Sequence, residues 1–558
     1  MTRSVPVDEV RPFGDRALLI GVDDARAGRR LAAALGHALG GADVEVVGGV
    51  ATVGVVARDP DAELGALRAV VHDTLGAARA PDATDVGASA GRLVTIPCAF
   101  DGPDLAEVAA LAGRSGDEVV ALLTSVTLTV SVVGFSPGFA YLDGLPAPLR
   151  TVPRRDRPRP VVPAGSVALA NGHAAVYPTP SPGGWQLVGR TGFPLFSLDG
   201  PPYAALAPGD RVRFAPAGAG DPLEPRPDAP AAWSAPHGAR LVLEVLAPGL
   251  RAVVQDAGRR GVAPTGVPAA GPADAVSGAL ANGLAGNAPG AGALECTGGG
   301  TRLRALGPCH VAVVGAAPEV RVDGTEVGPG RLVPLAEGQV LEIGVLRRGC
   351  RTYVAVAGGL LGPEVFGSQG SDELCGLGPG PLGPGALLWA GAWAPPLGDH
   401  LAPGAATELP AGAGPVELRV VRGPHAERFD PGVLDRLAAT TFRVGTASNR
   451  VGLRLEAQGA CDWRVRVAEL DSQPMVTGAV QLPPNGEPVV LLPDHATLGG
   501  YPVPGVVIAA DHGLLGQCGP GTVVRLVPVG SGEAEEALRE RRRATARAVM
   551  GHYPLAAG

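Results

Sequence analysis

Two segments of the chain place a pair of glycines directly before an aromatic residue. The first is Gly183, Gly184 and Trp185, and the second is Gly499, Gly500 and Tyr501. Glycine can adopt positive φ, so successive backbone N–H groups could turn toward one anion while the ring forms a wall beside it. Polar side chains lie close to both segments: Gln186, Arg190, Asp494 and Thr497. This grouping predicts a ligand pocket, although a tight barrel turn with a core aromatic would leave the same pattern.

Aromatic residues are concentrated in a third segment, SVVGFSPGFAYLDGLP at residues 131–146. Aromatics make up 4% of the chain, yet three of them fall within seven positions here. The pattern indicates a strand that enters a turn flanked by two phenylalanines. We expect an aromatic-rimmed small-molecule site with contacts from Ser136, Gly138 and Tyr141. A hydrophobic plug is the alternative interpretation.

Charged and amide side chains gather at two further predicted turns, within residues 253–287 and 446–456. They include Gln255, Asp256, Arg259, Asn449 and Arg450. An arginine can neutralise developing negative charge, and a carboxylate can act as a general base. Our catalytic candidates are therefore Arg259 and Arg450 for charge, and Asp256 and Asp494 for the base. A surface turn with capping residues would explain the first segment equally well.

The chain contains no lysine, and all 46 of its basic residues are arginines. A P-loop, a Schiff base and a covalently attached biotin each require a lysine, so none of them can form on this chain. Phosphate chemistry would have to use arginine, backbone N–H groups or a metal ion. The RRDRPRP segment at residues 154–160 could meet a phosphate, and a solvated loop explains it as well.

Composition argues against several classes of function. The net charge of −8 does not fit a nucleic-acid-binding protein, and no apolar run is long enough to span a membrane. The seven cysteines are scattered without a C-x-x-C pair, which favours reduced thiols in a cytoplasmic protein. The ten histidines are dispersed, so a histidine-held metal is not expected. Mg²⁺ held through phosphates stays open.

Hydrophobic periodicity predicts an α+β fold that is mostly β. Residues 1–90 are typical of a small β-α-β-β-α domain, and residues 91–215 of a β-barrel domain with helices capped by Asp104 and Ser115. Residues 216–238 are a Pro/Ala/Gly-rich linker. Residues 239–530 are expected to form two β-barrel lobes with helices within 272–286 and 432–440, followed by a helical tail at 531–558.

A repeat links the two halves. Residues 165–189 and 478–505 share the order of a Gly-small-Val strand, a glycine turn, a second strand and Gly-Gly-aromatic. Each is followed by a closing strand, PGDRVRF at 208–214 and PGTVVRL at 520–526, and EGQVLEIG at 337–344 has a similar ending. We therefore expect about three related barrel modules, each with its own core.

Longer motifs resemble a known family. GFSPGFAYLDGLP, VPAGSVALANG and SPGGWQLVGRT resemble the B-type subunit of bacterial 5-oxoprolinase, also known as allophanate hydrolase subunit 1 or a histidine-kinase inhibitor. The second half resembles the C-type subunit, or allophanate hydrolase subunit 2, in VVQDAGRRGVAPTGVPAAGPAD, NGLAGN, LECTGGG, YVAVAGGL, SNRVGLRLE and DHATLGGYP. The resemblance covers about residues 10–215 and 240–528, so the chain is similar to a natural fusion of the B-type and C-type subunits.

The resemblance implies cyclophilin-like β-barrels and ATP-dependent opening of 5-oxoproline to glutamate, with Mg²⁺ and a separate A-type subunit. It adds Ser166 and His173 to the expected pocket, His173 standing where relatives often have Gly-Gln. Ala257 departs from the leucine that often follows the Gln-Asp pair. These departures bear on the exact substrate more than on the fold.

Two other functions stay open. The same B–C pair is similar to the carboxyltransferase region of urea carboxylase, which implies a component that works with a biotin-bearing partner. The third possibility is a non-enzymatic regulator that inhibits a histidine kinase through an aromatic surface. The sequence leaves the oligomeric state open, a homo-oligomer included.

Overall fold

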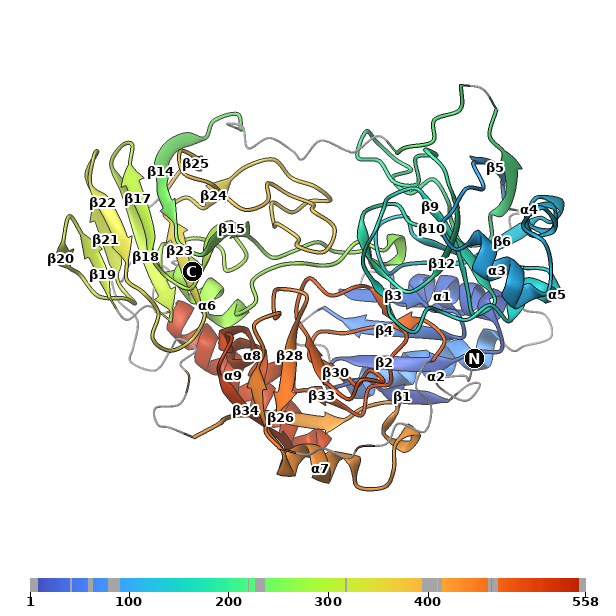
Figure 1. The fold of residues 1–558 in the computed structure, drawn as a ribbon. Helices are drawn as coiled ribbons and strands as arrows, with labels where there is room; N and C mark the ends of the chain where they lie inside the picture. The colour runs from blue at the N-terminus through green and yellow to red at the C-terminus, as the bar shows by residue number, and fades with distance from the viewer. Residues whose placement is uncertain are drawn as a thin grey trace.

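The computed structural model describes residues 9–40, 43–58, 64–78, 91–218, 220–225, 236–316, 319–393, 409, 414–459, 463 and 470–550 (Figure 1). Strands dominate, and two barrels are closed or nearly closed, so the predicted mostly β class is confirmed. Parts of the predicted linker, of the stretch before residue 91 and of the tail lie outside the described residues. Within the described part, no helix is both long and apolar enough to cross a membrane.

The N-terminal unit is a four-stranded sheet covered by two helices. Its elements are β1 (Val10–Pro12), β2 (Ala17–Gly21), α1 (Ala25–Ala38), β3 (Val44–Gly48), β4 (Thr52–Ala57) and α2 (Leu64–Ala78). The sheet order is β1-β2-β4-β3, and apolar residues of both helices pack against it. Helix α1 begins where the Asp24 carboxylate accepts a hydrogen bond from the Ala27 N–H at 2.8 Å.

The first barrel follows. Its elements are β5 (Leu93–Cys98), α3 (Leu105–Ala112), α4 (Gly116–Ser125), β6 (Leu128–Val133), β7 (Ala140–Asp143), α5 (Ala147–Arg150), β8 (Arg159–Val162), β9 (Ser166–Ala170), β10 (His173–Val176), β11 (Ser181–Gly183), β12 (Gln186–Arg190) and β13 (Arg211–Pro216). The seven-stranded order is β12-β9-β10-β7-β6-β13-β5. A single bridge between Ala99 and Arg190 brings its two edges together.

One of the two predicted helix caps is confirmed and the other is wrong. Ser115 caps α4, and Glu118 completes a capping box with it. Asp104 makes no side-chain cap to α3. Its buried carboxylate instead accepts hydrogen bonds from the Leu187 N–H at 2.7 Å and from Arg155 at 2.8 Å. Asp104 therefore bonds to residues that are distant in sequence, and not to the N–H groups of the helix that follows it.

The lobe that opens the second half is built from two sheets around one core. Its elements are β14 (Arg240–Pro248), β15 (Arg251–Gln255), η1 (Ala263–Thr265), α6 (Ala275–Leu284), β16 (Ala293–Thr297), β17 (Thr301–Ala305), β18 (Cys309–Gly315), β19 (Val320–Val322), β20 (Thr325–Glu326), β21 (Leu332–Leu335), β22 (Val340–Ile343), β23 (Arg351–Val356), β24 (Leu360–Leu361) and β25 (Leu387–Ala390). The sheet orders are β20-β19-β22-β17-β14-β25-β24 and β15-β16-β23-β18-β21. We call this unit the two-sheet lobe.

The second barrel is closed. Its elements are β26 (Val416–Arg422), η2 (Ala426–Arg428), α7 (Val433–Ala439), β27 (Thr441–Val444), β28 (Gly452–Ala457), β29 (Gln473–Pro474), β30 (Ala479–Gln481), β31 (Val489–Leu491), β32 (Leu498–Gly499), β33 (Gly505–Val507), η3 (Ala509–Asp511), α8 (His512–Gln517), β34 (Val523–Pro528) and α9 (Ser531–Met550). Helix α9 packs Ala534 and Ala537 against the barrel side and Val549 against α6. The predicted helices within 272–286 and 432–440 are present as α6 and α7.

The two barrels have the same strand order. The second runs β33-β30-β31-β28-β27-β34-β26, which matches β12-β9-β10-β7-β6-β13-β5 strand for strand. In both, the last two strands of that order pair in parallel, β13 with β5 and β34 with β26. The repeat between residues 165–189 and 478–505 is therefore confirmed as a duplicated barrel.

The third expected copy is different. Strand β22, which carries the EGQVLEIG ending, pairs in antiparallel fashion with β17 and β19 and has no parallel partner among the described strands. The two-sheet lobe has its own core, as expected, but it does not repeat the closure of the barrels. A Gly turn followed by an alternating strand is too common a pattern in β proteins to specify one closure.

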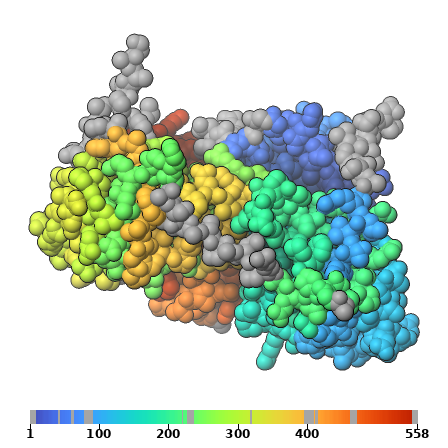
Figure 2. All heavy atoms as spheres, turned by 90° about the horizontal axis from the view of Figure 1, so that it is seen from above, coloured from blue at the N-terminus to red at the C-terminus, as the bar shows by residue number. Residues whose placement is uncertain are grey.

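The four units pack against one another through loops as well as through sheets. The N-terminal sheet lies against the second barrel, where a Cβ on Gly54 would come within 2.6 Å of Pro474. Figure 2 shows the segment around residues 360–390 in gold between the two-sheet lobe and the first barrel. Ring contacts confirm this bridge, because the Phe366 ring centroid lies 4.6 Å from that of Tyr203 and 6.2 Å from that of Phe196.

Candidate functional site

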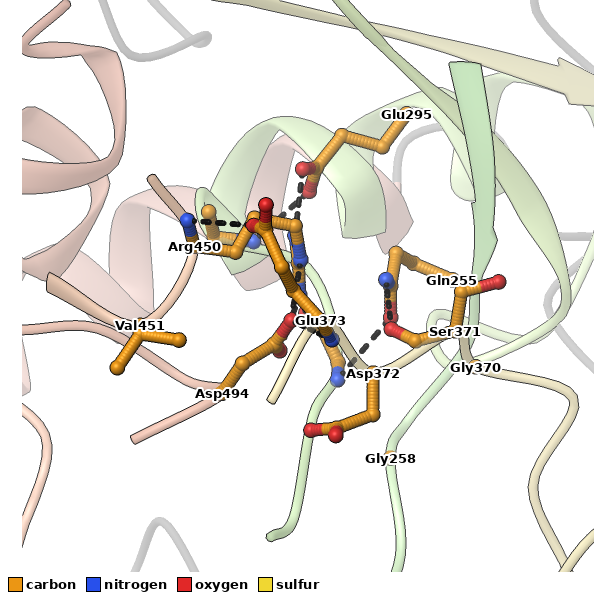
Figure 3. A network of polar contacts seen from close by, with 12 residues as sticks. Gln255, Gly258, Glu295, Gly370, Ser371, Asp372, Glu373, Arg450, Val451 and Asp494 are labelled. Carbon is orange, nitrogen blue, oxygen red and sulfur yellow. Dashed lines mark hydrogen bonds and ion pairs between the residues drawn. The ribbon is translucent and has the colours of Figure 1, made fainter. Parts of the chain in front are cut away.

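A buried ion network lies between the two-sheet lobe and the second barrel (Figure 3). The Arg450 guanidinium holds Asp494 with two hydrogen bonds of 2.9 and 2.8 Å, and it also pairs with Glu295. It donates a further bond of 2.6 Å to the Gly271 carbonyl. All three charged side chains are almost fully enclosed. A buried charge is tolerated only when it is paired and hydrogen-bonded, and this geometry meets that condition.

Glu295 is ionised within this network. Burial by itself would raise the pKa of Glu295, but Arg450 and Arg351 outweigh it and lower the pKa to about 2. Burial would lower the pKa of Arg351 in turn, and the Glu295 charge outweighs it and raises that pKa. Glu295 also accepts hydrogen bonds from the Ala273 N–H and the Tyr353 hydroxyl, at 2.9 and 2.8 Å. The sequence gives no signal for Glu295, because a single acidic residue in a strand has no distinguishing pattern.

A glycine-rich loop, residues 362–380, is tied to the network from both sides; we call it the 362–380 loop. Asp256 accepts hydrogen bonds from the Gln369 N–H at 2.7 Å and from the Ser368 hydroxyl. Gln255 donates to the Ser371 carbonyl at 2.7 Å. The Asp256 and Gln255 side chains therefore position this loop, and both oxygens of Asp256 are engaged in doing so.

Glu373 ties the same loop to the second barrel. Its backbone N–H donates to the Asp494 carboxylate at 2.9 Å, and its own carboxylate accepts a hydrogen bond from the backbone N–H of Arg450 at 3.0 Å. Asp494 thus accepts hydrogen bonds from both Arg450 and the backbone of Glu373. Of the two predicted bases, Asp256 and Asp494, each is occupied by hydrogen bonds to its neighbours, and a group with open acceptor capacity fits a proton-transfer role better.

Open polar capacity is found at Arg259 and Asp372. The buried Arg259 guanidinium donates to the Gly370 carbonyl, while its Nε and Nη1 have no partner among the described residues. Asp372 accepts from the Cys375 N–H through one oxygen, and its other oxygen has no partner among those residues either. The Gln369 side-chain oxygen is in the same condition. Each such group costs free energy until something binds it.

Burial shifts the pKa of both Asp372 and Arg259. Burial raises the pKa of Asp372 to about 7, and the nearby Asp494 charge adds to the effect. Burial lowers the pKa of Arg259 from its ordinary value, and Asp372 is the first of the acids that oppose this shift. In Figure 3 the Asp372 carboxylate points away from Arg450. A buried guanidinium beside a carboxyl that titrates near neutrality can bind an anion and exchange a proton.

The two Gly-Gly-aromatic segments have a different role from the predicted one. None of the four glycines has positive φ, so the expected anion nests are absent. A Cβ on Gly183 would lie 2.3 Å from the Tyr177 hydroxyl, and a Cβ on Gly499 would lie 2.6 Å from the Gln481 amide nitrogen. Glycine is needed there for close packing. Two glycines in a row signal either requirement, and the sequence does not distinguish them.

Trp185 is packed inside an aromatic cluster and is 6% exposed. Its ring centroid lies 5.7 Å from that of Phe139 and 5.7 Å from that of Tyr141. Leu498, next to the second Gly-Gly pair, belongs to the same cluster. Apolar packing therefore brings the two segments into one cluster. Tyr501 is half-buried.

The remaining predicted residues of the first barrel lie apart from the ion network. His173 is 2.6 Å from Asp143, Tyr141 accepts a hydrogen bond from Ser472 at 3.1 Å, and Ser136 is buried. Other members border a cavity of 620 Å³ near the 154–160 segment: Ser166, Arg190 and Arg159. Gln186 is buried beside Glu107, and Gly138 packs against Leu195.

Two further predicted residues border other cavities. Thr497 lines one of 430 Å³ where the N-terminal unit, the two-sheet lobe and the second barrel meet, and Asn449 lines one of 840 Å³ beside Arg450. The structure thus brings together Gln255, Asp256, Arg259, Arg450 and Asp494, and distributes the other predicted residues over the aromatic cluster, the rest of the first barrel and three separate cavities. Within the described residues, no three His, Cys, Asp or Glu side chains form a metal-ion cluster.

Comparison with known proteins accounts for both halves. The family model described as carboxyltransferase domain, subdomain C and D, matches residues 9–206, and subdomain A and B matches residues 265–528. The C-type subunit of 5-oxoprolinase from Escherichia coli K12 is 33% identical over 306 residues, which cover 54% of this chain and 96% of that protein. The B-type subunit from Escherichia coli O157:H7 is 48% identical over 128 residues, which cover 22% of this chain and 58% of that protein. The chain belongs to the family of the 5-oxoprolinase B-type and C-type subunits.

Two further relatives extend the comparison. The crystal structure of TTHA0988 is 33% identical with a TM-score of 0.79, and the match covers 92% of this chain and all of that one. The fused B–C arrangement is therefore present in a solved relative along its whole length. Urea amidolyase of Lachancea kluyveri is 29% identical over 309 residues, which cover 51% of this chain and 17% of that protein.

The family match places the ion network within one half of the fusion. Glu295, Asp372, Arg450 and Asp494 all lie in the subdomain A and B region, which corresponds to the C-type subunit. Phe366 connects that region to Tyr203, which lies within the subdomain C and D match. The 362–380 loop is thus the part of the C-type half that reaches from the network to the B-type half.

Proposed function

We propose that this chain is the fused B–C component of an ATP-dependent 5-oxoprolinase that acts with a separate A-type subunit. The observation that carries the proposal is the presence of both relatives in one chain, which is 48% and 33% identical to the B-type and C-type subunits of 5-oxoprolinase. The buried Arg259, whose Nε and Nη1 have no partner within the described part of the chain, supports it as well.

The chemistry of 5-oxoproline suits this group of residues. The molecule carries a carboxylate, for which a guanidinium is a natural partner, and a lactam whose N–H can donate to the open oxygen of Asp372. A lactam is a stabilised amide and reacts slowly with water. Phosphorylation of its oxygen by ATP would activate the carbon, water would then add and the C–N bond would break. Hydrolysis of the resulting acyl phosphate by a second water releases glutamate and phosphate.

The proposal is tested with the purified full chain and an A-type partner. Phosphate and glutamate release are measured with MgATP, in the presence and absence of 5-oxoproline. We expect 5-oxoproline to stimulate phosphate release when both proteins are present, with one glutamate formed per ATP. Phosphate release that does not respond to 5-oxoproline would refute the proposal.

A carboxyltransferase-like component of urea metabolism is the second candidate. It is favoured by the carboxyltransferase domain matches and by the 29% identity to urea amidolyase. Because the chain has no lysine, biotin would have to be carried by a partner. This candidate predicts that avidin, which sequesters biotin, inhibits the assembled activity, whereas the 5-oxoprolinase reaction would be insensitive to avidin.

A further inference from the structure

The largest of the cavities described above, at 840 Å³, lies where loops of the two-sheet lobe meet one end of the second barrel. On one side are the start of β15, the turn after β16 and the β22–β23 connection. On the other side are the β27–β28 and α8–β34 connections. We call it the arginine cavity, because its lining includes Arg251, Arg347, Arg348, Arg351 and Arg450.

The lining of this cavity is rich in positive side chains, whereas the whole chain has a net negative charge. Five arginines face one carboxylate, Glu373, in a chain whose net charge is −8. Arg351 and Arg450 are neutralised by Glu295 and Asp494 behind the wall. Arg251 is paired with Glu373 at 3.0 Å, and the exposed Arg347 and Arg348 add two further guanidiniums to the lining. Such a concentration of guanidiniums favours phosphate oxygens.

Size and lining define the ligand further. The volume falls in the range of roughly 300–1,000 Å³ that is usual for small-molecule sites. Ser448, Asn449 and Thr522 add polar groups that suit a ribose or phosphate. Leu250, which is 79% exposed, lines the cavity together with Leu346 and offers an apolar surface on which a flat ring can lie. The site thus combines an arginine-rich part with an apolar edge.

The arginine cavity is connected to the buried site by consecutive residues of one loop. Glu373 lines the cavity and accepts from Arg251 and the Arg450 N–H, while the preceding Asp372 is the carboxyl grouped with Arg259. A phosphate held in the cavity would touch the same short segment that faces Arg259.

We infer that the arginine cavity binds the phosphates of a nucleoside triphosphate through Arg251, Arg347 and Arg348. The identity of the ligand as a nucleotide rests on the proposed function; the affinity for a polyphosphate rests on the cavity itself. The chain supplies no lysine for this purpose, so arginine has to provide all of the side-chain positive charge that contacts the phosphates.

Binding is measured by calorimetry on the full chain, with MgATP, inorganic tripolyphosphate and adenosine as separate probes. The test variant is Arg347→Ala with Arg348→Ala. The control is Arg302→Ala with Arg304→Ala, which removes the same charge from the exposed face of β17 in the same lobe, outside the cavity. We expect the test variant to bind MgATP at least about 10-fold more weakly and the control to bind like the parent. Adenosine should bind far more weakly than MgATP.

A second measurement needs no substitution. Phenylglyoxal modifies accessible arginines, and mass spectrometry of the peptides reports which ones react. MgATP should protect Arg347 and Arg348, and leave Arg302 reactive. If the affinities of parent and test variant are equal, or adenosine binds as tightly as MgATP, or protection is absent, the inference is wrong. Tripolyphosphate that competes with MgATP supports it, and the ratio of the two affinities shows how much the nucleoside contributes.

The two proposals fail separately. If 5-oxoproline-stimulated ATP turnover is observed and the test variant retains it with an unchanged KM for ATP, the cavity inference is overturned while the proposed function stands. If MgATP binds in the cavity but 5-oxoproline stimulates no turnover, the site stands and the proposed function fails.

Discussion

At the scale of single residues, the central feature is the contrast between Arg450 and Arg259. Both guanidiniums are buried, but Arg450 is bound by two carboxylates whereas Arg259 makes one bond to a carbonyl. The first arrangement is typical of a structural ion pair, which stabilises a fold only when it is fully satisfied. The second leaves donors open and is typical of a group that binds a ligand.

Replacement of Arg259 by methionine tests this distinction. We expect Arg259→Met to raise the KM for 5-oxoproline at least about 10-fold, because the carboxylate loses charged hydrogen bonds. MgATP affinity should be unchanged. The neighbouring Arg260→Met is the control, since Arg260 is 60% exposed and makes a surface pair with Asp43 that contributes little. Binding of 2-pyrrolidinone, which lacks the carboxylate, should be equal in parent and Arg259→Met; a selective loss for that compound would contradict the assignment.

The buried Asp372 gives stability a pH dependence of defined sign. Its pKa is raised to about 7 in the fold, whereas an unfolded aspartate titrates near 3.9. The native chain therefore keeps a proton that the unfolded chain releases, so this group's contribution is full below about pH 4 and is lost as pH rises toward about 7. Asp372→Asn, which stays neutral, should gain stability over the parent at pH 8 by up to about 4 kcal/mol and be nearly equal to it at pH 4.

Melting temperatures of parent and Asp372→Asn at the two pH values provide the measurement. Asp101→Asn, in the exposed pair with Arg190, serves as the control and should show no such difference. A gap between parent and Asp372→Asn that is the same at both pH values would contradict the assigned titration.

At the scale of elements, the Gly183-Gly184-Trp185 segment shows how packing around a strand end can require glycine at one position and not at the next. Gly183 ends β11 directly under the Tyr177 ring, whereas the next position, Gly184, has room for a Cβ at 3.6 Å from Pro158. The two glycines are therefore not equivalent, although the sequence presents them as a pair. Only the first is required by its surroundings.

This difference can be measured with two alanine variants. Gly183→Ala should destabilise the protein by about 1–3 kcal/mol, because the new methyl group meets the Tyr177 hydroxyl and a packed core resists displacement. Gly184→Ala should be close to neutral. Chemical denaturation of the two variants and the parent provides the comparison. An equal loss of stability in both would indicate that backbone conformation, and not packing, selects glycine here.

At the scale of the whole molecule, the two halves of the fusion are joined by more than the linker. The 362–380 loop reaches Tyr203, Ser472 donates to Tyr141, and the N-terminal sheet rests on Pro474. Contacts of this kind connect regions that align with separate proteins in other members of the family. The covalent connection therefore reinforces an interface that the fold already provides.

A split chain tests that interface. We expect residues 1–225 and 226–558, produced together as two polypeptides with a tag on one, to copurify as a 1:1 complex. Phe366→Ala in the second piece should weaken the complex, because it removes the ring contacts with Tyr203 and Phe196. Phe442→Ala, in the core of the second barrel, lowers stability without touching the interface and is the control. Separate elution of the two parent pieces would show that the linker is what holds the halves together.

The local signals of the chain predicted much of the architecture. Apolar residues at helical spacing indicated α1, the helices α6 and α7 were expected within 272–286 and 432–440, and Ser115 marked the start of α4. The duplicated segments at 165–189 and 478–505 indicated two equivalent barrels, and the long motifs indicated the family. These features depend on neighbours within a few residues, or on similarity along the chain, and both can be read without coordinates.

Other features were decided by the tertiary structure alone. Glu295, Asp372, Arg450 and Asp494 come from distant parts of the chain, and only the packing of the two-sheet lobe on the second barrel brings them together. The same packing satisfied Arg450 and left Arg259 open, although both are arginines in similar polar turns. A residue's type determines what it can donate or accept, and the partners that the fold brings to it determine which of those bonds are made. The sequence therefore determined the chemistry available to this protein, and the tertiary structure decided where that chemistry is left unsatisfied and can bind a ligand.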